Sequence, residues 1–127
     1  MKFLVVDDSK LMRNMIDNMI KRYVGNVEIF HAEDGVHALK ILEENEGIRY
    51  MFSDWNMPNM EGIALLKAVR ADPDLKSLPV LMVTAEAKRD QIVEAAQAGV
   101  NGYIVKPFTA ETLKEKIDKI FERIDAQ

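Results

Sequence analysis

The stretch Phe3-Leu4-Val5-Val6-Asp7-Asp8-Ser9 decides the fold, because it joins a buried strand to polar groups and a helix start. Its first four residues form a continuous apolar run, which is typical of a parallel strand buried on both faces. Ser9 is a favoured N-cap, and from Lys10 to Tyr23 apolar side chains recur at helical spacing. The sequence therefore predicts a βα unit with Asp7 and Asp8 in the turn.

The same alternation of short apolar runs and helical stretches continues along the chain. Further strands are predicted at Val27–Phe30, Tyr50–Phe52, Val80–Thr84 and Gly102–Val105. Further helices are predicted at Val36–Glu44, across Ile63 to Val69, at Lys88–Ala98, and along the stripe Leu113, Ile117, Ile120, Phe121 and Ile124. Strands that alternate with helices indicate a parallel sheet covered on both faces. We expect a doubly wound (βα)5 fold of the α/β class, a three-layer sandwich around five parallel strands.

Composition excludes several classes of protein. The chain has 127 residues, a formal net charge of −4 and no cysteine. Without cysteine there is no disulfide scaffold, thiolate zinc site or cysteine nucleophile. An acidic chain is a poor partner for nucleic acid, and no apolar run approaches the length that crosses a bilayer. We therefore expect residues 1–127 to form one cytoplasmic domain that binds neither nucleic acid nor membrane.

Polar side chains end four of the five predicted strands. Asp7 and Asp8 follow the first strand, Asp54 the third, Thr84 ends the fourth, and Lys106 follows the fifth. Because parallel strands deliver their carboxyl ends to one edge of the sheet, these side chains should converge there.

Three converging carboxylates need a counter-charge. Two carboxylates about 4 Å apart repel by roughly 4 kcal/mol at an effective dielectric constant of about 20. Hard oxygen ligands on short loops suit Mg²⁺. Lys106 can balance an anion, Thr84 can donate a hydrogen bond to it, and a carboxylate can itself become an acyl phosphate. The set is typical of phosphoryl transfer.

Each of these signals alone is more often structural, because Asp pairs cap helices and a lysine before proline is usually a solvated loop end. Two other functions use a similar fold. A phosphatase with an aspartyl-phosphate intermediate would need Asp-x-Asp after the first strand, where this chain has adjacent aspartates. A flavodoxin would need a first loop rich in Ser, Thr and Gly, and the loop Asp7–Lys10 would repel phosphate.

The segments Leu4–Ser9, Ser53–Pro58, Val83–Ala85 and Val105–Phe108 together resemble the motifs of receiver domains of two-component response regulators. The resemblance covers the whole chain. It implies a flavodoxin-like fold with strand order 2-1-3-4-5 and a cis peptide bond before Pro107.

The resemblance also implies roles for the convergent residues. Asp54 would accept a phosphoryl group from the phosphohistidine of a sensor histidine kinase. Asp7, Asp8 and Asp54, with the backbone carbonyl of Asn56, would hold Mg²⁺. Lys106 would pair with the phosphoryl oxygens.

A second group of residues would transmit and tune the signal. On phosphorylation Thr84 would move to hydrogen-bond the phosphoryl group, and Tyr103 would swing inward behind it. Asn56 and Glu86 lie where the family tunes hydrolysis of the acyl phosphate. Residues at the family's target-binding positions are Ile92, Tyr103, Val105 and Lys116. The alternative for Tyr103 is a boundary residue with its hydroxyl in water.

Within the family, the segments Asp54–Met60 and Thr84–Lys88 resemble the chemotaxis regulators. The resemblance thus implies a stand-alone, monomeric phosphoacceptor switch, which is no enzyme for a separate substrate. Its partners would be a sensor histidine kinase, a flagellar motor switch protein and a phosphatase. A receiver that relays phosphate to another protein is the alternative that the residues separate least well.

The methionines carry two structural predictions. Met12, Met15 and Met19 share the apolar stripe of the first helix and are expected to fill the core. Met57 and Met60 lie in the loop after Asp54 and are expected to be exposed.

Overall fold

The computed structural model describes residues 1–85 and 88–125, along which strands and helices alternate. The strands are β1 (Lys2–Val6), β2 (Glu28–Ala32), β3 (Ile48–Asp54), β4 (Val80–Thr84) and β5 (Gly102–Val105). The helices are α1 (Lys10–Val24), α2 (Gly35–Glu44), α3 (Gly62–Ala71), α4 (Arg89–Gln97) and α5 (Ala110–Asp125). None of the helices in the described ranges is both long enough and apolar enough to cross a membrane.

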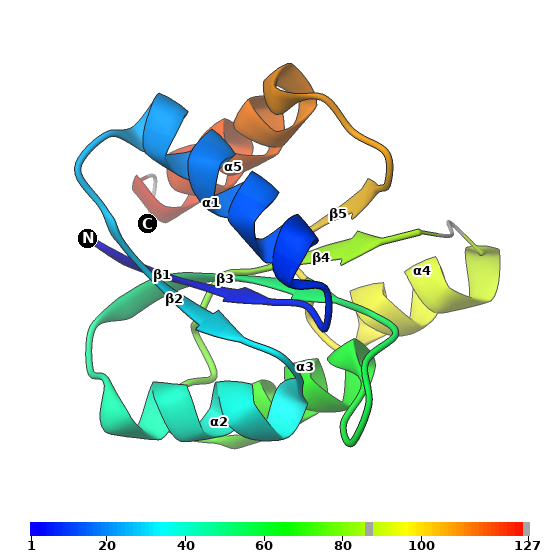
Figure 1. The fold of residues 1–127 in the computed structure, drawn as a ribbon. Helices are drawn as coiled ribbons and strands as arrows, with labels where there is room; N and C mark the ends of the chain where they lie inside the picture. Colours follow the sequence, from blue (N-terminus) through cyan, green and yellow to red (C-terminus); the bar gives the residue numbers. More distant parts are fainter. Residues whose placement is uncertain (86–87, 126–127) are drawn as a thin grey trace.

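The strands form one parallel sheet in the order β2-β1-β3-β4-β5, as the resemblance implied. Helices α1 and α5 cover one face, and α2 and α3 cover the other (Figure 1). The α/β doubly wound prediction is confirmed. From β2 the chain returns past β1 to β3, so the strand order reverses between β1 and β3. In such sheets ligands bind beyond the carboxyl ends of the strands at this reversal.

Two cores lie on opposite faces of the sheet, and β1 contributes to both. Phe3 and Val5 pack in the core under α1 and α5, whereas Leu4 and Val6 pack in the core on the side of α2, α3 and α4. Successive strand residues point to opposite faces, so a strand with helices on both sides must be apolar throughout.

The third strand is longer than the apolar run Tyr50–Phe52 that predicts it. It begins at Ile48 and ends at Asp54, and Ser53 and Asp54 are both buried. The sequence pattern underestimates this strand because its last two residues are polar. Their burial already indicates that this end of the strand has a use other than packing.

The methionine predictions are wrong in part. On α1, Met12 and Met19 pack against the core, but Met15 is 43% exposed and the neighbouring Leu11 is 72% exposed. Met57, expected to be exposed, is a residue of the β3–α3 loop whose side chain is buried in the core. The stripe on α1 is therefore wider than the surface that the helix buries.

Arg70 near the end of α3 holds together the two segments that precede β4 and β5. Its guanidinium group donates hydrogen bonds of 2.7–3.2 Å to the backbone oxygens of Lys76, Leu78 and Gly99 and to Oδ1 of Asn101. The same Asn101 oxygen accepts a hydrogen bond of 2.8 Å from Val80 N at the start of β4. Burial lowers the pKa of Arg70.

Replacing Arg70 with methionine should lower the free energy of unfolding by about 2–4 kcal/mol, because several partly buried oxygens lose a charged donor. Urea denaturation measures the loss. Lys67→Met, on the same helix, is the matched control, since Lys67 makes only an exposed 3.4 Å ion pair with Glu94. It should change stability by less than about 0.5 kcal/mol. Equal losses in the two variants would contradict the structural role of Arg70.

Candidate functional site

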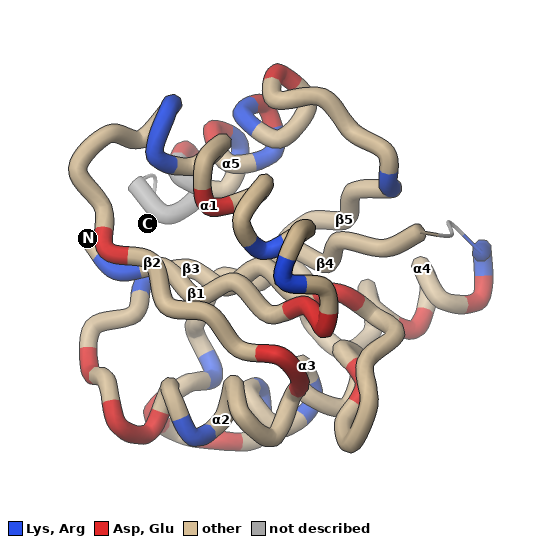
Figure 2. The backbone as a smooth tube through the Cα atoms, viewed as in Figure 1, with Lys and Arg blue, Asp and Glu red and all other residues tan. Residues whose placement is uncertain are grey.

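The register of the sheet sets two aspartates side by side at the reversal of strand order. Val6 of β1 pairs with Ser53 of β3, so Asp7 and Asp54 follow on neighbouring strands. Asp7 is 1% and Asp54 7% exposed, whereas Asp8 faces solvent. Carboxylate oxygens of Asp7, Asp8 and Asp54 lie within 4.8 Å of one another. In Figure 2 the positions of acidic residues directly after β1 lie at the carboxyl edge of the sheet.

The same register brings the ends of β4 and β5 to this edge. Thr84 pairs with Val105, and Lys106 N donates a hydrogen bond of 2.7 Å to Thr84 O. The peptide bond between Lys106 and Pro107 is cis, as the resemblance implied. The five residues predicted to converge from four strands are therefore brought to one edge.

Lys106 bridges the two buried carboxylates. Its Nζ lies 2.9 Å from Asp7 Oδ2 and 3.4 Å from Asp54 Oδ2. The other Asp7 oxygen accepts a hydrogen bond of 2.8 Å from Ser9 N. Lys106 is thus shared by two buried carboxylates, and the carboxylate of Asp8 lies close to both of them.

The surroundings of Asp54 disfavour its charged form. Burial raises the pKa of its carboxyl group, and the charge of Asp7 raises it further. Lys106 and the Trp55 N–H, which donates to Asp54 Oδ1 over 2.8 Å, partly offset this rise in pKa. A divalent cation would remove the repulsion. The cluster offers carboxylate oxygens only, which is the donor chemistry that Mg²⁺ prefers, so the residues present fit that ion.

Arg13 is a contributor that sequence reasoning missed. Its Nη1 donates a hydrogen bond to the backbone oxygen of Asp7 over 2.6 Å. Arg13 lies one turn into α1 and reaches back over the loop that carries the two aspartates. Helical periodicity predicts on which face of α1 the Arg13 side chain lies. It does not predict which carbonyl oxygen the end of this long side chain will hydrogen-bond.

Thr84 and Tyr103 lie next to each other behind the acidic edge. Thr84 is buried, and Tyr103 is half-buried against the core on the α2–α4 side. Burial raises the pKa of the Tyr103 phenol, and a hydrogen bond with the Thr84 side chain works in the opposite direction. Tyr103 therefore has Thr84 as a neighbour.

The remaining predicted residues lie around this centre and on a separate face. Asn56 is exposed on the loop after β3. Ile92 on α4 and Val105 on β5 are exposed apolar side chains, and Lys116 on α5 is half-buried. Glu86 lies outside the described residues.

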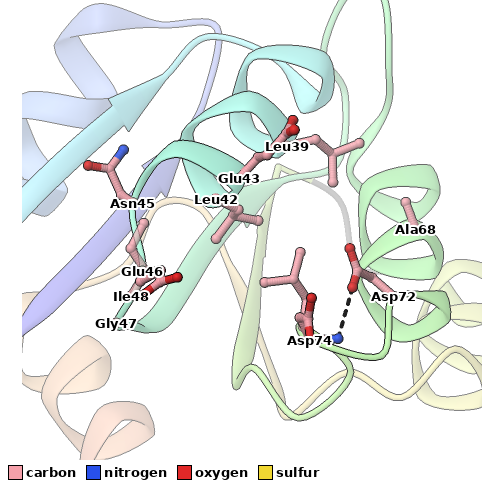
Figure 3. Close-up of a pocket in the computed structure, with 11 residues that line it drawn as sticks. Leu39, Leu42, Glu43, Asn45, Glu46, Gly47, Ile48, Ala68, Asp72 and Asp74 are labelled. Carbon is pink, nitrogen blue, oxygen red and sulfur yellow. Dashed lines mark hydrogen bonds between the residues drawn. The ribbon is translucent and has the colours of Figure 1, made fainter.

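A cavity of about 860 Å³ lies away from the acidic edge. Figure 3 shows its lining, which comes from α2, the turn before β3 and the end of α3, and includes Leu42, Glu43, Ile48 and Asp72. None of the converging aspartates lines it. The chemistry of the chain is thus concentrated on an open edge.

The pKa of Asp54 yields a prediction for stability. Because burial raises this pKa above its value in the unfolded chain, the free energy of unfolding falls as pH rises through the interval between the two values. Asp54→Asn removes the charge and keeps the shape. In Mg²⁺-free buffer at neutral pH it should therefore raise the melting temperature by a few degrees.

Thermal unfolding of the parent and Asp54→Asn across pH checks this, and the gain should disappear towards about pH 4, where the aspartate is protonated. The exposed Asp118 on α5 supplies the control variant Asp118→Asn, which should show no such pH-dependent gain. A lower melting temperature of Asp54→Asn at neutral pH would show that the charge of Asp54 does not destabilise the folded state.

Comparison with known proteins identifies the family. The sequence model of the response regulator receiver domain matches residues 3–118. The chain is 61% identical to chemotaxis protein CheY of Pseudomonas aeruginosa over 125 residues, which cover 98% of this chain and 99% of that protein. It is 60% identical to chemotaxis protein CheY-3 of Vibrio cholerae over 124 residues, which cover 98% and 94% of the two chains.

Solved structures agree with the sequences. The chemotaxis response regulator CheY4 of Vibrio cholerae superposes with a TM-score of 0.84 at 34% identity, covering 94% of this chain and 97% of the other. The Mn²⁺-bound form of response regulator Rcp1 superposes with a TM-score of 0.77 at 25% identity, covering 94% and 88%. This chain belongs to the response regulator receiver domain family and is similar over nearly its whole length to chemotaxis CheY proteins.

Proposed function

We propose that this chain is a Mg²⁺-dependent switch of chemotaxis, in which Asp54 accepts a phosphoryl group from a sensor histidine kinase. The family is one of phosphoacceptor switches, distinct from enzymes that turn over a separate substrate. The observation that carries the proposal is the setting of Asp54, a buried carboxylate beside two others, with the ammonium group of Lys106 3.4 Å away.

The metal would be held by oxygen atoms at the open edge. Asp7, Asp8 and Asp54 would supply carboxylate ligands, and Asn56 would supply its backbone carbonyl. Bound Mg²⁺ would contribute positive charge for the oxygens of the transferred group. The Mn²⁺-bound form of the relative Rcp1 supports a divalent cation in this fold.

The transfer itself needs an ionised nucleophile. A carboxylate oxygen of Asp54 would form a bond to phosphorus while the bond from phosphorus to the histidine nitrogen breaks, and the imidazole would keep that electron pair. Lys106 would pair with the negatively charged phosphoryl oxygens, since its Nζ already lies between Asp7 and Asp54. Asn56 and Glu86 would tune the later hydrolysis of the acyl phosphate.

The switch would run through Thr84 and Tyr103. Thr84 would hydrogen-bond the phosphoryl group, and Tyr103, its present hydrogen-bond partner, would follow it inward. A ligand shifts a two-state equilibrium only by its differential interaction with the two states, so about 1.4–2.8 kcal/mol gives a tenfold to hundredfold shift. Switching should therefore be partial.

The face of α4, β5 and α5 would bind the target. Its elements carry the exposed apolar residues Ile92 and Val105 and the half-buried residues Tyr103 and Lys116. The high identity to chemotaxis CheY proteins supports a flagellar motor switch protein as the target in the cytoplasm, with a phosphatase as a further partner. A monomer presenting this surface would suffice, and neither nucleic acid nor membrane is required.

Beryllofluoride, which mimics a phosphoryl group on a carboxylate, should change the fluorescence of Trp55 in the parent protein when Mg²⁺ is present. Trp55 is buried and directly follows Asp54, to which its N–H donates. Asp54→Asn should abolish the response. A variant that responds as the parent does would show that Asp54 is not the acceptor. A parent protein that responds to beryllofluoride but then binds no motor switch protein would instead favour a relay.

Asp8→Ala should weaken the affinity for Mg²⁺ at least about tenfold, because the variant loses a charged ligand at a site that has few others. Titration of Trp55 fluorescence with Mg²⁺ gives the dissociation constant. Glu33→Ala is the matched control, since Glu33 is an exposed acid at the end of β2 that lies outside the cluster. Similar losses in both variants would point to a general electrostatic effect and against coordination by Asp8.

A further inference from the structure

We propose that Asp34 and Asn59 are positioning residues of the metal site. Their side chains tie the tip of the β3–α3 loop, residues 55–61, to the start of α2. The loop carries the Asn56 backbone carbonyl, so the inference rests on the proposed function, in which that carbonyl is a ligand.

The loop is held at its base and at its tip. At the base, Gly62 N donates to Trp55 O over 2.8 Å. At the tip, Asn59 Nδ2 donates to Asp34 Oδ2 over 2.7 Å, and the backbone oxygen of Met60 accepts from Gly35 N over 3.2 Å. Asn56 lies between these two anchored points.

Asp34 is suited to act as a fixed anchor. It is buried, and its Oδ1 accepts a hydrogen bond of 2.8 Å from His37 N, which makes it the N-cap of α2. Oδ2 remains for Asn59. The His37 N–H and then the Asn59 amide lower the pKa of Asp34, so the carboxylate stays ionised. Because Asp34 is fixed at the start of α2, its carboxylate can hold the tip of the β3–α3 loop in one position.

The backbone at the tip of the β3–α3 loop is consistent with the hydrogen bond between Asp34 and Asn59. Asn59 has a φ of 66°, the left-handed region that asparagine and glycine tolerate best. Beside it, the Met60 side chain comes within 2.6 Å of the point where a Cβ on Gly35 would lie. Only glycine at the start of α2 therefore lets the loop approach this closely.

The consequence concerns geometry at the metal. Mg²⁺ demands nearly ideal octahedral coordination, so a displaced carbonyl is a poor ligand. Removing partners that orient metal ligands typically weakens affinity 10–100-fold. Loss of the Asp34–Asn59 hydrogen bond should therefore weaken Mg²⁺ binding without removing any ligand atom.

The test uses three variants of the full chain. Asn59→Gly keeps the positive φ and removes the donor, and it should weaken Mg²⁺ affinity about tenfold. Asn59→Asp sets two carboxylates against each other and should also weaken affinity, although its added negative charge alone would attract the cation. In the double variant Asp34→Asn/Asn59→Asp the new amide can accept from the His37 N–H and donate to the new carboxylate. The double variant should bind within about twofold of the parent.

Two readouts give the dissociation constant independently: Mg²⁺ titration of Trp55 fluorescence, and Mn²⁺ titration followed by water-proton relaxation. Melting temperatures in a metal chelator separate local positioning from general destabilisation. Parent-like affinity of Asn59→Gly, or failure of the double variant to recover, would overturn the inference. Should the parent itself bind neither ion, the proposed function would fail first, so the two failures are distinguishable.

Discussion

Two buried carboxylates share a single ammonium group at the carboxyl edge of the sheet, and the other properties of the site depend on this imbalance. Asp7 and Asp54 are both shielded from water, and Lys106 lies nearer to Asp7. Asp54 is therefore the less compensated charge, and burial together with the charge of Asp7 raises its pKa. A cation beside such a group would stabilise its charged form.

The strands that build the acidic edge also lead from it to β5, at the end of the sheet. Thr84 ends β4 at the acidic edge, and its neighbour Tyr103 belongs to β5. Val105, the partner of Thr84 in the register, is exposed on the face of α4, β5 and α5. In the proposed switch, a movement of the buried Thr84 hydroxyl would reach that surface through Tyr103, which packs against one of the two cores.

The sequence predicts whatever follows from periodicity and from parallel topology. Apolar runs and helical stripes give the βα order, and the rule that parallel strands end at one edge is enough to bring Asp7, Asp54, Thr84 and Lys106 together. Side-chain contacts between distant segments leave no periodic trace. The hydrogen bond between Asp34 and Asn59 and the reach of Arg13 to the Asp7 carbonyl are of this kind. The exposure of Met15 and the burial of Met57 likewise depend on which neighbour covers a residue, which amphipathic pattern does not specify.

The open position of the acidic edge has a kinetic consequence. Asp8 and Asn56 are exposed beside the buried Asp54, and the large cavity lies away from them. A phosphoryl group held beside these exposed residues would stay in reach of bulk water, which could then hydrolyse it. The chain itself would then determine the lifetime of its phosphorylated state, because its loops would control how water reaches and is oriented at the phosphoryl group. Small changes in those loops could lengthen or shorten the signal that follows a stimulus. The sheet, the two cores and the face of α4, β5 and α5 would stay unchanged.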